Sequence, residues 1–423
     1  MSGETVMEHF PNQPHQNEEN AIRYLTSFVS KPLNNTNTEE EIKLKEDSIM
    51  ELGNMLARNK RTQDLRDMIQ NTRPFLVSLG KAKAAKLVRN LLDLCLMIED
   101  QVGEIKIDLC KECIQWAEDE HRTFLRQTLQ ARLVRLYNDL NRYSQSLVLA
   151  SSLIRELKKV DDKDLIVEVQ LEESKACYHL ASLAKARTAL TSARTTANSM
   201  YIPPKMQAAL DMQSGILHAA DERDFKTAFS YFYEAFEGYD SVNEKIEALR
   251  ALKYMLLCKI MLDSPDEINT ILSHKTAMKY SGSDIEAMRA IANSAKKRSL
   301  ADFNKAFGSF RQELQCDPVV KKHFNSLSDS MLEKDLCRII EPYSYVQIAH
   351  VASKIGLPKD RVEKKLSQMI LDGKFSGSLH QGEGMLIIYE VEPVDKTYEL
   401  AVETIHAMGE VVDALYARAR KIR

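Results

Sequence analysis

Glycine and proline are both scarce in this chain. Among 423 residues there are 14 glycines and 11 prolines, fewer than an all-β or a disordered protein of this length would use for turns and breaks. The scarcity favours long helices instead. No run of apolar residues approaches the roughly 18 that a membrane-spanning helix needs, so a soluble protein is expected.

The chain also lacks a secretory signal and an excess of positive charge. Residues 1–20 are acidic and polar, without the basic start and apolar centre of a signal peptide, and we expect an intracellular protein. The 58 basic side chains are balanced by 61 acidic ones, for a net charge of −3. Because nucleic-acid affinity requires several phosphates to be neutralised, this balance does not favour a nucleic-acid binder.

Sequence motifs of catalysis are absent. There is no G-x-G-x-x-G after a strand, no G-x-x-x-x-G-K-[ST], no H-E-x-x-H and no G-x-S-x-G. Lone histidines such as His179, His218 and His350 lie in predicted helices, where a packed or surface role is the commoner one. We therefore expect no enzyme, no cofactor and no small-molecule substrate, although a site assembled only by folding stays open.

The seven cysteines do not form a disulfide framework. Their number is odd and they lie within helical patterns, as reduced thiols in cores do. Cys110 and Cys113 make a C-x-x-C, but no second pair follows at zinc-finger spacing. Both share one apolar helix face with Ile107 and Ile114, which favours a core role, and no metal site is expected.

A repeat of about 40 residues, the spacing of paired-helix repeats, is the main positive signal. Because a single helix pair cannot bury its own apolar stripe, neighbouring pairs must stack into a solenoid. The landmarks of the repeat are Thr62, Val102, Tyr143, Leu183, Phe225 and Pro265. First helices are predicted at Lys83–Glu99, Arg122–Asn141, Leu165–Ser182, Met206–Ala219 and Glu244–Leu262, and second helices at Tyr143–Lys159, Leu183–Met200 and Phe225–Tyr239.

These patterns predict a mostly α protein whose centre is a right-handed α-solenoid of TPR-like helix pairs. Residues 1–40 are expected to be a disordered or weakly ordered tail and linker, with a short helix at Glu19–Val29. The predicted solenoid covers residues 41–298. Residues 299–392 would hold a helical link and a winged helix, and residues 393–423 a last helix.

The winged helix is predicted from residues 341–390. Ser344 and Gln347 have the spacing of a capping box, and Gly356 ends the first helix. A second helix follows over Lys359–Asp372, with an apolar face opposite a charged one. Two short strands, Lys374–Leu379 and Met385–Tyr389, then flank a glycine-containing turn typical of a hairpin.

The second of these strands is the candidate interaction site. DNA reading is disfavoured because the second helix is nearly neutral, and the basic clusters at Lys81–Arg89 and Lys296–Arg298 are better explained as solvated helix faces. An apolar strand left at a sheet edge requires a cover, which a protein partner could supply by strand addition. The predicted contact residues are Met385, Leu386, Ile387, Ile388 and Tyr389.

A last amphipathic helix is predicted at Lys396–Arg423. Its apolar residues step by three or four, as in a heptad pattern. Either this stripe folds back onto its own winged helix, or it enters a bundle made with other subunits. The residues predicted to face such a bundle are Tyr398, Val402, Ile405, Met408, Val412 and Leu415.

A helical solenoid followed by a winged helix and a terminal helix resembles the PCI family, the scaffolding subunits shared by the proteasome lid, the signalosome and translation initiation factor three. The local sequence is most similar to the lid members. The stretches that carry this resemblance are Lys253–Leu262 (KYMLLCKIML), Arg298–Phe303 (RSLADF), Glu363–Asp372 (EKKLSQMILD), Gln381–Gly384 (QGEG) and Pro393–Tyr398 (PVDKTY).

The resemblance implies a non-catalytic scaffold of the proteasome lid, in the cytoplasm and the nucleus. It implies contacts with other lid PCI subunits through the winged helix and the C-terminal helix, and with the core-particle α-ring and the ATPase ring through the N-terminal solenoid. It also implies support for the ATP-dependent degradation of ubiquitinated proteins. A signalosome or initiation-factor subunit is the alternative, and a winged-helix nucleic-acid binder is the more distant one.

Overall fold

The computed structural model describes residues 14–30, 39–98, 103–221, 224–315, 317–389 and 396–422, and these are almost entirely helical apart from one small sheet. The chain divides into two compact units. The first runs from Met1 to Leu262 and includes Lys275–Tyr280, and the second holds Asp263–His274 and Ser281–Arg423. The domain boundary predicted at residues 298 and 299 lies inside the second unit.

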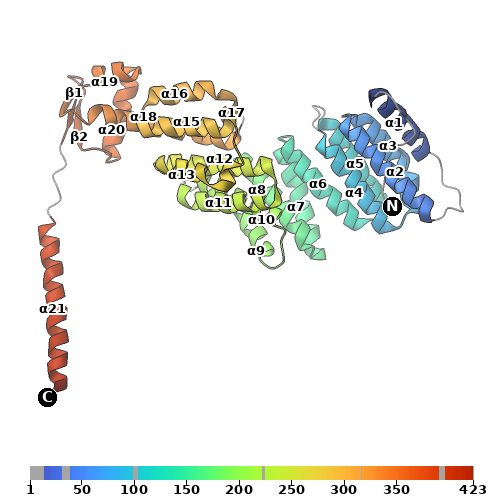
Figure 1. Cartoon of the computed structure of the whole chain (residues 1–423), viewed down its shortest axis with the longest axis horizontal. Helices are drawn as coiled ribbons and strands as arrows, with labels where there is room; N and C mark the ends of the chain where they lie inside the picture. The colour runs from blue at the N-terminus through green and yellow to red at the C-terminus, as the bar shows by residue number, and fades with distance from the viewer. Residues whose placement is uncertain are drawn as a thin grey trace. The chain divides into compact units, whose positions relative to one another are not determined.

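The first unit is a stack of helix pairs (Figure 1). Thr62, Tyr143, Leu183 and Phe225, four landmarks of the predicted repeat, are the first residues of α3, α7, α9 and α11, which confirms the paired-helix solenoid. Val102 lies outside the described residues. The helices are α1 (Pro14–Ser30), α2 (Glu39–Arg58), α3 (Thr62–Ser78), α4 (Lys81–Met97), α5 (Gly103–Asp119), α6 (Thr123–Asp139), α7 (Tyr143–Val160), α8 (Lys163–His179), α9 (Leu183–Ala197), α10 (Pro204–Asp221), α11 (Phe225–Val242), α12 (Lys245–Met261) and α14 (Lys275–Met278).

A recurring turn reverses the chain between paired helices. Between α6 and α7, Asn141 has a left-handed backbone (φ 59°), and the amide of Arg142 donates to the carbonyl of Tyr137 at 2.8 Å. The turn between α8 and α9 repeats this geometry at Ala181 (φ 58°). This is the Schellman arrangement, which satisfies the last carbonyls of one helix and lets the next helix start at once in the opposite direction.

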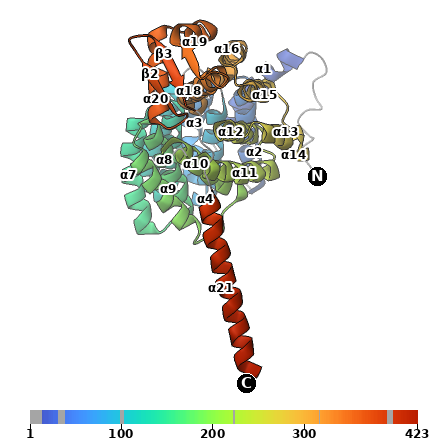
Figure 2. The same ribbon diagram turned by 90° about the vertical axis from the view of Figure 1, so that its left-hand side faces the viewer.

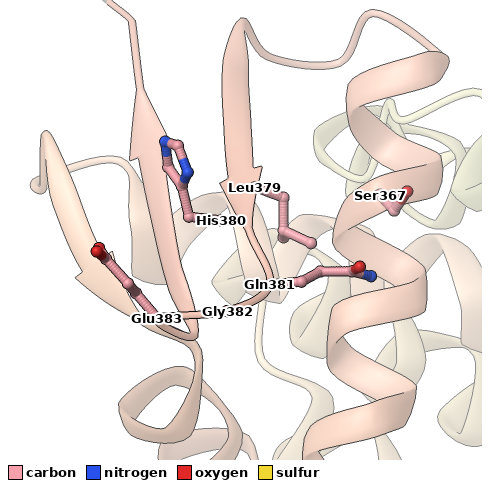
Figure 3. A pocket seen from close by; sticks show the side chains of 6 residues that line it. All are labelled: Ser367, Leu379, His380, Gln381, Gly382 and Glu383. Atoms are coloured by element: carbon pink, nitrogen blue, oxygen red, sulfur yellow. The ribbon is translucent and has the colours of Figure 1, made fainter.

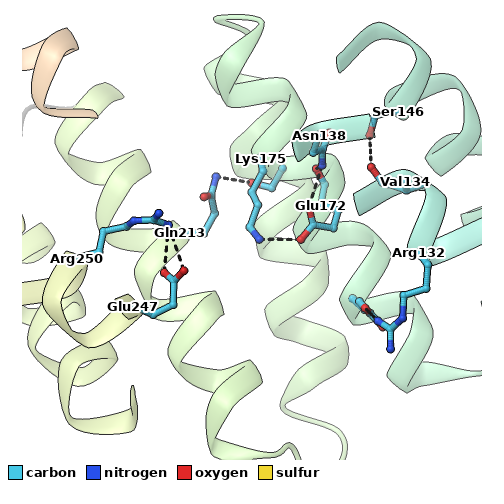
Figure 4. A network of polar contacts seen from close by, with 11 residues as sticks. Arg132, Val134, Asn138, Ser146, Glu172, Lys175, Gln213, Glu247 and Arg250 are labelled. Atoms are coloured by element: carbon cyan, nitrogen blue, oxygen red, sulfur yellow. Dashed lines mark hydrogen bonds and ion pairs between the residues drawn. The ribbon is translucent and has the colours of Figure 1, made fainter. Parts of the chain in front are cut away.

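Small residues let the paired helices approach closely. Ser146 on α7 and Ala186 on α9 occupy equivalent repeat positions and are both 0% exposed. The Ser146 hydroxyl donates to the carbonyl of Val134 on α6 at 3.3 Å, and the Ser174 hydroxyl on α8 donates to the carbonyl of Ala186 at 2.9 Å. Burying these hydroxyls is tolerated because each finds a partner. Figure 4 shows the contact between Ser146 and Val134.

Buried charge also ties α6 to α8. Asn138 on α6 donates to the Glu172 carboxylate at 2.9 Å, and Lys175 donates to it at 2.7 Å. Burial opposes the charged form of Glu172, but the ammonium of Lys175 and these hydrogen bonds hold its pKa below the usual range. The Glu172 carboxylate is therefore a structural contact between α6 and α8 (Figure 4).

The N-terminal helix belongs to the core. Ile22, Leu25 and Val29 on α1 are buried and join the same apolar cluster as residues of α2 to α6. The predicted short helix at Glu19–Val29 lies within α1, and the expectation of a weakly ordered tail does not hold for residues 14–30. Residues 31–38 of the predicted tail and linker lie outside the described residues.

The predicted core role of the C-x-x-C is confirmed. Cys110 and Cys113 on α5 are free, buried and part of the same apolar cluster. Burial raises the pKa of the Cys110 thiol and raises that of Cys113 to about 12, which suits inert thiols. Within the described residues, no group of three or more His, Cys, Asp or Glu side chains is placed to hold a metal ion.

The second unit begins with helices, continues in the winged helix and ends with α21. Its α16 to α18 occupy the predicted helical link, and the sheet lies beside α19 and α20 (Figure 2). Across the parts of the chain that the structure describes, no helix is long and apolar enough to cross a membrane. The elements are α13 (Asp266–Ser273), α15 (Ser283–Lys297), α16 (Leu300–Ser309), α17 (Arg311–Gln315), α18 (Pro318–Ile340), β1 (Tyr345–Gln347), α19 (Ile348–Ile355), α20 (Lys359–Leu371), β2 (Gly377–His380), β3 (Met385–Ile388) and α21 (Thr397–Ile422).

Candidate protein-interaction surfaces

The sheet of the winged helix has the strand order β1-β3-β2, with both pairs antiparallel. β3 is therefore the central strand, and the prediction that Met385–Tyr389 forms an unpaired edge is wrong. The missed element is β1, whose pairing covers one side of β3. The free edges of the sheet belong to β1 and β2, so strand addition by a partner would occur there.

The capping box predicted at Ser344 and Gln347 is also wrong. The segment from Tyr345 to Gln347 is extended, and the Ser344 carbonyl accepts the Ile388 amide at 2.9 Å. Helix α19 starts only at Ile348, without a side-chain cap. Pairing with a strand 40 residues later overrides the local helix-start signal, because strand formation depends on distant partners.

Side chains alternate across the sheet, as strand geometry requires. Val346 on β1 and Leu386 on β3 are cross-strand partners and are 5% and 0% exposed. Leu386 therefore belongs to the core, contrary to its predicted place on a contact surface. Gly377 on β2 is required by close packing, because a Cβ there would lie 2.5 Å from the Ile387 carbonyl oxygen.

The opposite face of the sheet is aromatic and apolar. Tyr345 is 65% exposed and is the partner of Ile387, which is half-buried. Tyr389, 53% exposed, donates its phenol proton to the Ser378 hydroxyl at 3.0 Å, which fixes its ring on this face. We call Tyr345, Met385, Ile387 and Tyr389 the outer sheet face. Period-two alternation within Met385–Tyr389 was the sequence signal that separates these residues from Leu386.

Helix α20 does not present a strong basic surface. The Lys365 ammonium pairs with the Glu333 carboxylate of α18 at 2.8 Å, and Asp360 lies among the exposed Lys359, Arg361 and Lys364. Affinity for a nucleic-acid backbone grows with the number of phosphates neutralised. Lys359, Arg361 and Lys364 are the three exposed cations of this helix, with Asp360 among them, so the helix can neutralise few phosphates and offers little support for nucleic-acid reading.

A depression beside the β2–β3 turn has no catalytic arrangement. It is lined by Ser367 of α20 and by residues 379–383. Leu379 and Gln381 point toward α20, whereas His380 and Glu383, its two titratable groups, point away from Ser367 (Figure 3). No nucleophile is held by a base within hydrogen-bonding reach, which acyl or group transfer would require.

The C-terminal helix exposes its apolar stripe. Helix α21 starts at Thr397, close to the predicted start, and every side chain described in it is exposed. The six predicted bundle residues are among them, with Ile405 at 69% and Val412 at 62%. An amphipathic helix gains most of its stability by burying such a stripe, so these residues remain the candidates for a contact with other helices.

Comparison of the chain with known proteins identifies its family. The chain matches the N-terminal domain of the 26S proteasome regulatory subunit RPN6 over residues 6–140, the PCI domain over 300–390 and the RPN6 C-terminal helix domain over 394–420. It is 69% identical to a probable 26S proteasome regulatory subunit, rpn-6.1, of Caenorhabditis elegans, over 100% of this chain and 96% of that protein. The chain belongs to the Rpn6 family of 26S proteasome regulatory subunits.

More distant members of the Rpn6 family also match along most of their length. The 26S proteasome non-ATPase regulatory subunit 11 homolog of Arabidopsis thaliana is 46% identical over 96% of each chain. The probable regulatory subunit rpn6 of Schizosaccharomyces pombe is 48% identical over 88% of this chain and 87% of the relative. The predicted resemblance to PCI subunits of the proteasome is confirmed. As a proteasome regulatory subunit, the protein assembles with other proteasome subunits.

Proposed function

We propose that this protein is a non-catalytic scaffold of the proteasome lid that holds the regulatory particle on the core particle. Through this role it supports the ATP-dependent degradation of ubiquitinated proteins in the cytoplasm and the nucleus. The observation that carries the proposal is the exposed apolar stripe of α21 in a chain of the Rpn6 family, since such a stripe requires other helices to cover it.

Three regions of the protein would contact other subunits. The outer sheet face and the edges of β1 and β2 would contact a neighbouring PCI subunit. Helix α21 would enter a bundle with other lid subunits. The helix pairs of the first unit would reach the α-ring of the core and the ATPase ring, because stacked repeats offer long continuous surfaces. Neither a nucleic acid nor a membrane has a part in this proposal.

Purification of the tagged protein from its native cells tests the proposal. Core-particle and ATPase subunits should accompany it in near-equal amounts. Recovery of signalosome or initiation-factor subunits in their place would favour the corresponding PCI scaffold, and recovery without any of these subunits would overturn the proposal. A salt-sensitive shift of labelled duplex at physiological ionic strength would favour the nucleic-acid alternative.

A further inference from the structure

The chain passes between the two compact units at three points within residues 263–282, which we call the connector. It leaves the first unit after Leu262, returns to it at Lys275 and leaves it again after Tyr280. Helix α13 therefore belongs to the second unit, whereas α14 and the two residues that follow it belong to the first. A simple linker would pass between the units only once.

The first half of the connector is fastened to the second unit. The Lys334 ammonium of α18 pairs with the Asp263 carboxylate at 2.6 Å, and the Lys296 ammonium of α15 pairs with that of Asp266, the first residue of α13, at 2.7 Å. Exposed ion pairs are individually weak, but α13 also packs on α15, and its Ile268 is buried. Helix α13 should therefore move together with the second unit.

The second half of the connector is fastened to the first unit through Tyr280. This side chain is 8% exposed, and its ring stands edge-on to that of Phe236 on α11, with 5.6 Å between the centroids. The Tyr280 hydroxyl donates to one oxygen of the Asp240 carboxylate on α11 at 2.7 Å, and the Lys279 ammonium lies 3.2 Å from the other oxygen. We call these contacts of Tyr280 and Lys279 with Asp240 the clasp.

Both partners in the main hydrogen bond of the clasp are in the protonation state that the bond requires. Burial and the bond to Asp240 raise the pKa of Tyr280 to about 12, so the phenol keeps the proton that it donates. The hydrogen bonds from Tyr280 and Lys279 lower the pKa of Asp240, so its carboxylate stays charged. Because a hydrogen bond to a charged acceptor is stronger than one between neutral groups, Tyr280 is the main anchor of the clasp.

Short joints separate these fastenings. His274 lies between α13 and α14, is exposed and has an extended backbone. Ser281 and Gly282 lie between Tyr280 and α15, and no atom lies within 4 Å of the position that a Cβ on Gly282 would take. A hinge is usually made of a few such residues, which absorb the change in φ and ψ when two parts of a protein rotate.

The clasp determines the length of the link between the last fastening and α15. With the clasp closed, residues 275–280 are held on the first unit, and only residues 281 and 282 remain as the link to α15. With the clasp open, this link extends over residues 274–282. The root-mean-square span of a flexible link grows with the square root of its length, so the longer link permits a wider range of motion.

We propose that the connector is a hinge between the two units and that the clasp limits its motion. A closed clasp holds the units within a narrow range of relative orientations, and an open clasp widens that range. This inference goes beyond the proposed function, because it applies to the isolated chain as well as to the assembled one.

Hydrogen exchange of the full-length protein tests the clasp. Tyr280→Phe keeps the ring and removes the hydroxyl, so the amides of residues 275–282 should exchange about tenfold faster or more. Tyr233→Phe is the matched control, because the Tyr233 hydroxyl also bonds a carboxylate of α11, that of Glu237, but its side chain is 44% exposed and lies outside the connector. The control should change exchange in the connector less than about twofold. Exchange in Tyr280→Phe within about twofold of the wild type would overturn the proposal.

The distance between the units tests the hinge. Spin labels are attached to azide-bearing amino acids that replace the exposed Lys185 of α9 and Lys305 of α16, because the chain's seven cysteines would compete for thiol labels. Pulsed electron paramagnetic resonance then gives the distribution of distances. Tyr280→Ala removes the ring as well and should open the clasp, so the distribution should become about twofold wider, as expected for a link that grows from residues 281–282 to 274–282. Tyr233→Ala should leave the width unchanged. Equal widths in the wild type and in Tyr280→Ala, with equal circular dichroism spectra, would overturn the hinge and leave the proposed function standing.

Discussion

Replacing Asp335 should loosen one helix of the second unit selectively. Asp335 on α18 is 5% exposed, and its carboxylate accepts the Leu300 amide at the start of α16 at 3.1 Å. It also accepts two hydrogen bonds from Arg338, from Nε at 3.2 Å and from Nη2 at 2.6 Å. The carboxylate therefore holds the N-terminus of α16 on α18.

The size of the effect follows from these contacts. Loss of a capping acceptor costs about 1 kcal/mol. The ion pair with Arg338 adds less than about 1 kcal/mol, because that side chain is 49% exposed and well solvated. Asp335→Ala should therefore destabilise the local structure by about 2 kcal/mol. This raises the equilibrium constant for local opening of α16 about 30-fold.

Native-state hydrogen exchange, followed by mass spectrometry, measures this change in local opening. Peptides from α16 should exchange about 30-fold faster in Asp335→Ala, while peptides from α6 to α8 in the first unit should be unchanged. Arg338→Ala keeps the cap and should change exchange in α16 by less than about fivefold. Exchange in α16 within twofold of the wild type would show that the Asp335 cap does not hold this helix.

Three further predictions, made with four substitutions, test other contacts. Leu386→Asp should unfold the winged helix, whereas Ile387→Asp on the outer sheet face should keep its circular dichroism spectrum and weaken incorporation into the proteasome; equal loss of fold in both would refute the assignment of faces. Phe232→Ala should lower the free energy of unfolding by about 3 to 5 kcal/mol, because this ring is 1% exposed; urea denaturation monitors it, and a loss below about 1 kcal/mol would contradict the packing. Glu112→Gln should destabilise the first unit at pH 7, because the Arg66 hydrogen bond lowers the pKa of the carboxylate. Because the pKa of Glu112 is lower in the folded state, its charged form stabilises the fold at a pH above the unfolded-state pKa, and this stability is lost as the pH falls. The difference in urea midpoint between the variant and the wild type should therefore shrink below about pH 4. A constant difference down to about pH 3 would contradict this.

The helical part of the fold was predictable from local signals. Helix starts at Tyr143, Leu183 and Phe225 follow from apolar periodicity and from the spacing of the repeat, both of which are properties of short segments. Helix α20 was predicted for the same reason. The turn residues between paired helices also act locally, because each satisfies the carbonyls of the helix that precedes it.

The sheet was less predictable because strands depend on distant partners. The segment Tyr345–Gln347 resembles a helix start in isolation and becomes β1 only by pairing with β3. The same pairing places β3 at the centre and moves the free edges to β1 and β2. For the candidate site, the six predicted residues of α21 are exposed, and their packing in a bundle stays a prediction. Leu386 was misplaced because all of Met385–Tyr389 was predicted to form one contact surface, whereas alternation along a strand turns Leu386 toward the core and Met385 and Ile387 toward the outer sheet face.

A chain that lacks residues 398–423 shows whether α21 is needed to bind this protein into the proteasome. The truncated and full-length chains are expressed with the same tag in native cells, and the ratio of each to core-particle subunits is measured in purified 26S proteasome. The truncated chain should keep the circular dichroism spectrum of a folded solenoid and should be missing from the assembled particle. Incorporation of the truncated chain at the level of the full-length chain would contradict it.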